Sequence, residues 1–155
     1  MKLETKDRIK VLAISSGGGH WVQLRRLAPA FEGCDLTYAT VDTSVAESVS
    51  PASVYGFPDA NKDQKIRLIW SALVIAWILF RVRPDVIIST GAAGGFLAIA
   101  IGRLFKIKGL FVDSIANAKE LSVSAKMALP IANEVYTQWP EVAQKQNAKF
   151  RGSVL

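Results

Sequence analysis

The sequence predicts an α/β fold, a Rossmann-like open parallel sheet with helices on both faces, formed as one domain over residues 1–155. Three observations predict it. Short β-rich runs alternate with longer helical runs, which is typical of βα units and a parallel sheet. Glycine-rich segments follow the first and fourth predicted strands, at the edge where such sheets bind ligands. The length of 155 residues fits a single hydrophobic core.

The predicted elements alternate along the whole chain. The strands, in order, are Ile9–Ser15, Asp35–Thr40, Ser53–Phe57, Asp85–Ser89, Gly109–Asp113, Glu134–Thr137 and Lys149–Arg151. The helices are Trp21–Phe31, Asp63–Val82, Phe96–Phe105, Glu120–Leu129 and Pro140–Gln146. A Ser/Ala/Pro stretch between the second and third strands has room for another short helix. Pro84 ends the longest helix because proline cannot continue the helical hydrogen-bond ladder.

The composition is apolar and basic. Half of the residues are hydrophobic and 21% are charged, so apolar surface is left over for a membrane or a partner protein. The formal charge of +6 favours an anionic partner such as phosphate, acidic headgroups or nucleic acid. Nucleic acid is the least expected of these, because the cations are not interleaved with exposed aromatic residues.

The chain has one cysteine and one histidine, which limits its chemistry. Cys34 cannot form an intramolecular disulfide, and with His20 alone there is no recognisable zinc-ligand set. We therefore expect a reducing cytoplasm, no metal and no cofactor. Met1–Lys10 lacks an apolar stretch of about 7 to 15 residues behind its charges, so no secretory signal is expected.

Two glycine-rich segments are candidate anion sites. Each lies between a strand and a helix, where backbone N–H groups and the helix dipole favour a phosphate or another anion. The alternative is that the glycines only permit tight turns. The first segment does not match the dinucleotide fingerprint, because its three glycines are consecutive and no further glycine follows at the required spacing, and the Gly-Lys-Ser/Thr of a triphosphate P-loop is missing. The candidate anion-binding residues are Ser16, Gly17, Gly18, Gly19, Gly91, Gly94 and Gly95.

Two titratable residues are expected at the same edge of the sheet. His20 opens the first helix, and a neutral imidazole there could take a proton from an attacking hydroxyl. Asp113 ends a strand and could act as the base or hold acceptor hydroxyls. A helix cap or a structural hydrogen bond is the alternative for His20, and helix capping is the alternative for Asp113 or Ser114.

The segment Ile66–Phe80 is apolar apart from Arg67 and Ser71. About 15 helical residues span only ~22 Å, less than the ~30 Å hydrocarbon core, so a full membrane crossing is not expected. Tryptophans flanked by arginines suit an interfacial position beside anionic headgroups. The alternative is complete burial against the sheet. The expected membrane contacts are Arg67, Trp70, Trp77, Phe80, Arg81 and Arg83.

Five motifs occur together in one order. They are Ser16–His20, Ile88–Gly91 with its following glycines, Asp113-Ser114, Leu121-Ser122 and Gln138-Trp139-Pro140-Glu141. Taken together, they resemble the family of asparagine-linked glycosylation protein fourteen, whose bacterial relatives are PssD-type subunits of exopolysaccharide and capsule synthesis. The resemblance spans the chain from about Lys10 to Leu155.

The resemblance implies the N-terminal, acceptor-binding half of a GT-B glycosyltransferase, similar to that domain of MurG. Such a chain is a membrane-associated subunit that works, by an inverting mechanism, only with a small PssE-like partner carrying the UDP-sugar. The acceptor is a polyprenyl-pyrophosphate-linked saccharide at the cytoplasmic face of the inner membrane. His20 or Asp113 would be the base, and Ser114 and Asn117 would join the glycine segments in holding the acceptor. The implied partner interface is Trp139, Pro140, Glu141, Gly152, Val154 and Leu155.

The sequence departs from the family pattern at two points. Members often have Glu where Asp113 stands and Arg near Asn117, and eukaryotic members begin with a membrane-spanning helix that this sequence lacks. Membrane attachment would therefore rest on Ile66–Phe80, the partner and the lipid acceptor. Two other functions stay open: a non-catalytic membrane scaffold that activates the partner, and an unrelated nucleotide-binding Rossmann domain.

Overall fold

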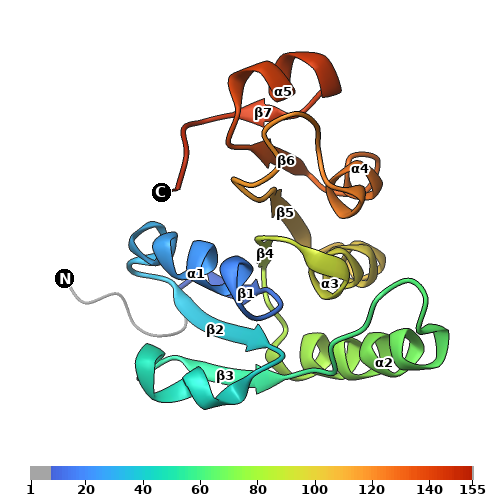
Figure 1. The fold of residues 1–155 in the computed structure, drawn as a ribbon. Helices are drawn as coiled ribbons and strands as arrows, with labels where there is room; N and C mark the ends of the chain where they lie inside the picture. Colours follow the sequence, from blue (N-terminus) through green and yellow to red (C-terminus); the bar gives the residue numbers. More distant parts are fainter. Residues whose placement is uncertain (1–7, 155) are drawn as a thin grey trace.

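The computed structural model describes residues 8–154 and shows a seven-stranded parallel sheet in the order β3-β2-β1-β4-β5-β6-β7 (Figure 1). The strands are β1 Lys10–Ile14, β2 Asp35–Thr40, β3 Ser53–Gly56, β4 Val86–Ser89, β5 Lys108–Val112, β6 Glu134–Thr137 and β7 Lys149–Phe150. After β3 the chain crosses to the other side of β1. The carboxyl ends of β1 and β4 therefore flank the switch point of the sheet, the place where open α/β sheets bind ligands.

Helices cover both faces of the sheet, as predicted. The α-helices are α1 Gly19–Arg26, α2 Lys65–Val82, α3 Ala92–Leu104, α4 Val123–Ala128 and α5 Pro140–Gln146, and two 3₁₀ helices are η2 Ala28–Phe31 and η3 Thr43–Val49. Figure 1 shows α1 on one side of the sheet and α2, α3 and α4 on the other. The predicted Rossmann-like architecture is confirmed.

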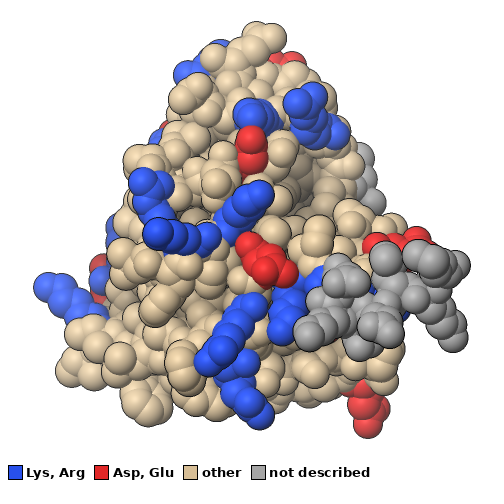
Figure 2. All heavy atoms as spheres, turned by 180° about the vertical axis from the view of Figure 1, so that it is seen from behind, with Lys and Arg blue, Asp and Glu red and all other residues tan. Residues whose placement is uncertain are grey.

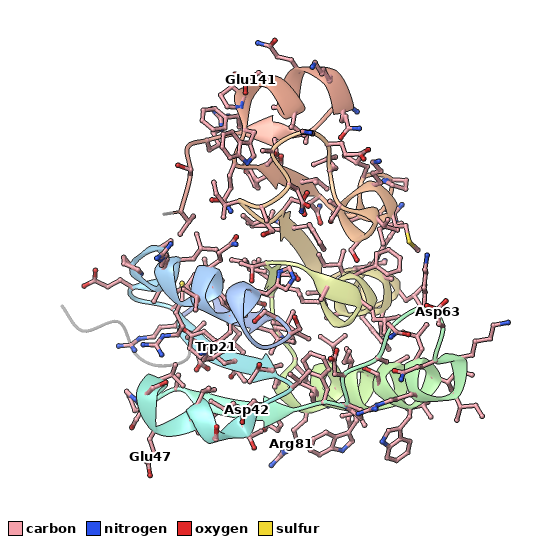
Figure 3. The ribbon with its side chains drawn as sticks, viewed as in Figure 1. Trp21, Asp42, Glu47, Asp63, Arg81 and Glu141 are labelled. Carbon is pink, nitrogen blue, oxygen red and sulfur yellow. The ribbon has the colours of Figure 1, made fainter. Side chains whose placement is uncertain are left out.

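The central strand β1 contributes to two hydrophobic cores. Leu12 and Ile14 point into the core beneath α2 and α3, whereas Val11 and Ala13 point into the core beneath α1. This alternation follows from the two-residue period of a β-strand. Trp21 of α1 closes the second core (Figure 3), with its ring edge-on to Tyr38 at 5.3 Å between centroids.

The helix boundaries correct the sequence prediction at several points. α1 ends at Arg26 and is followed by η2, because Pro29 cannot donate a helical hydrogen bond. α3 begins at Ala92 rather than at Phe96, so two glycines expected in a loop lie in its first turn. α4 is shorter than predicted and begins after Ser122, whose hydroxyl accepts a hydrogen bond from the Ala125 N–H at 3.0 Å.

The long helix α2 runs antiparallel to the strands. β3 ends at the carboxyl edge of the sheet, here called the ligand rim, and β4 begins at the opposite edge. α2 connects them, so its first turn at Lys65 lies on the side of the ligand rim. Its last turn lies at the opposite edge, where Arg83 adopts a left-handed conformation before Pro84.

Candidate functional site

The first glycine segment, residues 15–20, and the second, residues 91–95, lie together at the ligand rim. His20 of the first segment contacts Thr90, the residue just before the second. The His20 Nδ1 lies 2.9 Å from the Thr90 carbonyl oxygen, and the Thr90 hydroxyl donates to the His20 carbonyl at 2.7 Å. These reciprocal bonds join residues 70 positions apart in the sequence. The prediction that both segments lie at one edge is confirmed.

The contact with Thr90 determines which nitrogen of His20 can act as a base. A carbonyl oxygen only accepts hydrogen bonds, so Nδ1 carries a proton, and in the neutral imidazole Nε2 is then the nitrogen with the lone pair. Gly91 leaves room for the ring, because a Cβ at this position would lie 2.6 Å from Nδ1. The imidazole is partly exposed, so solvent and ligands can reach the ring.

The first glycine segment leaves the amino end of α1 open. Gly18 precedes the helix with a φ of 63°, and no side chain caps the helix there. A Cβ built at Gly18 or Gly19 meets no atom within 4 Å. Backbone N–H groups that no side chain caps, at the amino end of a helix, suit an oxyanion. Ser16 and Gly17, both partly buried, lead into this turn.

Two predicted anion-binding glycines lie inside a helix. Gly94 and Gly95 are buried in the first turn of α3, where a Cβ would collide with the Phe57 ring and the Ser89 side chain, respectively. Both positions therefore let the helix approach the neighbouring residues closely. Their part in ligand binding stays a prediction, whereas Gly91 lies directly beside the His20 ring.

Asp113 is buried, with 1% of its surface exposed, and its carboxylate is engaged within the protein. Oδ1 accepts a hydrogen bond from the Asn117 side-chain amide at 3.0 Å, and Oδ2 accepts one from the Ser122 N–H at 2.8 Å. The carboxylate thus holds the segment that follows β5 in place, and the side-chain amide of Asn117 is already hydrogen-bonded to it. His20 is better placed to receive a proton from a ligand.

The sequence prediction missed two buried glutamines beside this segment. Gln138 donates through Nε2 to Gln23 Oε1 at 2.8 Å and to the Asp113 carbonyl at 3.0 Å. Gln23 donates in turn to the Ser114 hydroxyl at 3.1 Å. Gln23 lies on α1 one turn after His20. Its sequence signal was a polar residue on the face of the helix that is turned toward the sheet. Gln138 belongs to a recognised motif, but its partners are distant in the sequence.

The predicted partner residues lie around α5 and the C-terminal segment. Trp139 faces inward and donates through Nε1 to the Ile115 carbonyl at 2.7 Å, whereas Pro140 and Glu141 are exposed at the start of α5 (Figure 3). Val154 N–H donates to Gln138 Oε1 at 2.7 Å. The exposed Gly152 precedes it with a φ of 104°, and Leu155 lies outside the described residues.

The helix α2 exposes one apolar face. Its buried residues are Ser71, Ile75, Ile78 and Leu79, and its exposed apolar residues are Ile66, Ile69, Trp70, Leu73, Trp77 and Phe80. Trp70 is 58% exposed and Phe80 is 69% exposed. Complete burial of this helix, the alternative raised from the sequence, is therefore wrong. Within residues 8–154, no helix is both long and apolar enough to span a bilayer.

Cations border the exposed face of α2. Arg67, Arg81 and Arg83 are all exposed, and Figure 3 shows Arg81 pointing away from the sheet. The Arg83 guanidinium lies over the Phe80 ring, 5.4 Å from its centroid. Two residues at the end of α3 that the predicted membrane contacts omitted, Leu104 and Phe105, are also exposed. On the face in Figure 2, Lys and Arg are spread widely rather than gathered in one patch.

A separate cavity of about 570 Å³ lies at the other end of α1, near the starts of the strands. Arg8, Arg25 and Tyr38 contribute to its wall. Burial raises the pKa of the Tyr38 phenol, and the positive charge of Arg25 partly offsets this effect. Among the described residues, no three His, Cys, Asp or Glu side chains are grouped to hold a metal ion.

Solved structures with this fold include enzymes of nucleotide-sugar metabolism. MurG of Acinetobacter baumannii superimposes with a TM-score of 0.71 at 12% identity, over 86% of this chain and 43% of that one. UDP-N-acetylglucosamine 2-epimerase from Rickettsia bellii gives 0.73 at 12% identity, over 94% and 45%. The chain thus spans less than half of each protein, and the similarity at this identity shows the fold alone.

Sequence comparison is more specific. The family model described as oligosaccharide biosynthesis protein Alg14 like matches residues 59–154. The UDP-N-acetylglucosamine transferase subunit alg14 of Schizosaccharomyces pombe is 36% identical, over 93% of this chain and 82% of its own length. The human subunit ALG14 is 21% identical, over 94% and 82%. These matches support a glycosyltransferase subunit, and the chain belongs to the Alg14-like family of oligosaccharide biosynthesis proteins.

Proposed function

We propose that this protein is the acceptor-binding, membrane-associated subunit of a two-component inverting glycosyltransferase. A small donor-binding partner supplies a UDP-sugar, and the acceptor is a polyprenyl-pyrophosphate-linked saccharide in exopolysaccharide or capsule biosynthesis. The relatives are named as UDP-N-acetylglucosamine transferase subunits, which makes N-acetylglucosamine the first sugar to test.

The observation that carries the proposal is the orientation of His20. Its Nδ1 is bonded to the Thr90 carbonyl at the ligand rim, which leaves Nε2 as a proton acceptor. In the proposed reaction the acceptor hydroxyl oxygen bonds to the anomeric carbon while the bond from that carbon to the UDP oxygen breaks. The hydroxyl proton passes to Nε2, and UDP leaves with the electron pair, so the anomeric configuration inverts.

The open amino end of α1 offers a place for the acceptor pyrophosphate. No side chain caps this end of the helix, and a Cβ built at Gly18 or Gly19 would meet no atom within 4 Å. The helix dipole and these donors both favour negative charge. Because His20 lies in the same turn, an anion held there would place the attached saccharide beside the base.

The exposed face of α2 is the proposed membrane contact. Apolar residues with intervening tryptophans occupy this face, and Arg67, Arg81 and Arg83 border it. Such a helix binds in the plane of an anionic membrane surface through apolar burial and headgroup attraction. Localisation at the cytoplasmic face of the inner membrane follows from this surface and the lipid-linked acceptor, and it is proposed together with them.

The test of catalysis uses the protein reconstituted with its donor-binding partner, UDP-sugars and a polyprenyl-pyrophosphate-linked acceptor. His20→Ala should lower kcat by about 10²- to 10⁴-fold, the usual contribution of a positioned general base. Gln144→Ala, an exposed residue on α5, is the control. Full turnover by His20→Ala would reject His20 as base, and full turnover by a variant that also carries Asp113→Asn would favour a non-catalytic scaffold. Tight binding of a free nucleotide by this chain alone would support the nucleotide-binding alternative.

The test of membrane binding compares two exposed apolar residues. Leu73 lies on the apolar face of α2 and is 58% exposed, whereas Val123 lies on α4 and is 66% exposed. Flotation with vesicles containing anionic phospholipid should weaken for Leu73→Ser and stay unchanged for Val123→Ser. Equal binding by both variants would place the membrane contact elsewhere.

A further inference from the structure

A chain of hydrogen bonds joins the C-terminal segment Arg151–Val154 to the ligand rim, and its direction is determined by the backbone. The Val154 N–H can only donate, and the Asp113 carbonyl can only accept. Gln138 therefore turns Oε1 toward Val154 at 2.7 Å and Nε2 toward Asp113 at 3.0 Å. The second proton on Nε2 goes to Gln23 Oε1 at 2.8 Å.

The same logic continues to Ser114. Since Gln23 accepts through Oε1, its Nε2 faces the Ser114 hydroxyl oxygen at 3.1 Å. That oxygen also accepts a hydrogen bond from the Ala116 N–H at 3.2 Å. A serine hydroxyl has two acceptor sites and one donor hydrogen. Both acceptor sites of Ser114 are occupied, and among residues 8–154 its hydrogen has no acceptor.

Burial leaves these side chains few alternative hydrogen-bond partners. Gln23 and Gln138 are 6% and 4% exposed, so water has little access to replace the bonds between them, whereas Ser114 keeps 9% of its surface exposed. Leaving one of these groups without its partner would cost the full desolvation of a buried polar group. Gln23 also lies one turn after His20, so Ser114 is tied to the helix that carries the proposed base.

We propose that Ser114 donates a hydrogen bond to a phosphate oxygen of the lipid-linked acceptor, and that the C-terminal segment holds it in this orientation through Gln138 and Gln23. The inference rests on the proposed function and assigns to Ser114 a specific role in it. A hydroxyl restricted to donation discriminates in favour of an acceptor-only group, which an ionised phosphate is. Whatever holds Val154 in place therefore also orients a ligand contact at the rim, and by linkage a bound ligand holds Val154 more firmly.

The first test concerns Ser114, in the pair reconstituted with a short-chain polyprenyl-pyrophosphate-linked N-acetylglucosamine. Ser114→Ala should raise KM for this acceptor about 10-fold, the loss expected for a hydrogen bond to a charged group, with kcat little changed. Ser114→Thr retains the hydroxyl and should restore KM, which guards against general misfolding. Ser124→Ala on α4 is the matched control. An unchanged KM in Ser114→Ala would overturn the assignment.

The second test concerns the C-terminal segment. Val154→Pro removes the N–H that Gln138 accepts from, whereas Val154→Ala shortens the side chain and retains the N–H. Because Val154 also belongs to the proposed partner interface, the two variants are compared with each other: Val154→Pro should raise KM for the acceptor above the value of Val154→Ala, and only Val154→Pro should speed amide exchange at Ala116. Identical behaviour of the two variants would overturn the coupling. The amide-exchange measurement needs no turnover. An inactive wild-type pair would therefore reject the proposed function, while the exchange at Ala116 would still decide the coupling.

Discussion

Replacing Gly91 with alanine would add a methyl group where His20 already lies. The new Cβ would stand 2.6 Å from His20 Nδ1, which is 0.8 Å short of the 3.4 Å of an ordinary contact. Gly91 also has a φ of 130° and a ψ of −173°. This backbone region is open essentially only to glycine, and an alanine there costs about 2 kcal/mol.

Two measurable losses follow for Gly91→Ala. The backbone strain alone should lower Tm by about 4 to 8 °C for a chain of this size, measured by circular dichroism. Moving the imidazole by nearly 1 Å should lower kcat of the reconstituted pair about 10²-fold, because a misplaced catalytic group loses its alignment with the substrate.

The control for this prediction is Gly33→Ala. Gly33 also has a positive φ, 83°, but a Cβ there meets no atom within 4 Å. Its Tm should fall through backbone strain while kcat stays at the wild-type value. If Gly91→Ala kept wild-type kcat, or matched Gly33→Ala in both measurements, the geometric argument linking Gly91 to the histidine would be refuted.

Three further predictions concern α2, Tyr38 and Asp113. Trp70→Ala combined with Trp77→Ala should reduce partitioning into anionic vesicles about 10-fold or more, measured by flotation, because two large exposed side chains lose apolar contact with lipid. Burial raises the pKa of Tyr38 despite the nearby Arg25. The neutral phenol therefore contributes fully to folding stability below about pH 10, and this contribution is lost as pH rises through the folded-state pKa. Urea midpoints should therefore fall more steeply at high pH for the wild type than for Tyr38→Phe. Asp113→Asn should lower the free energy of unfolding by about 2 kcal/mol in urea titrations. The new side-chain NH₂ group would face either the Asn117 amide or the Ser122 N–H, both of which are donors.

The strands were predictable because their signals are local. β2 and β6 match the predicted ranges Asp35–Thr40 and Glu134–Thr137 at both ends. Hydrophobic runs bounded by turn residues identify such strands, and alternation with helices implies parallel pairing. The pairing of the two glycine segments also followed, because carboxyl ends of parallel strands share one edge.

Other features depend on contacts that no local pattern encodes. The start of α3 was missed because glycines are weak helix formers, while their burial against Phe57 and Ser89 favours the helix. The Gln23–Gln138 hydrogen bond joins residues 115 positions apart. The engagement of Asp113 by Asn117 and the Ser122 N–H likewise required the folded chain.

The direction of α2 has a consequence for how a lipid-borne substrate would be found. The helix starts on the carboxyl side of the sheet, as the glycine segments do, so the proposed membrane contact extends toward the edge that carries the proposed site. A prenyl-anchored molecule could then arrive by lateral diffusion and remain anchored while its headgroup reached His20. The search would be two-dimensional, and the encounter rate would follow surface density rather than bulk concentration.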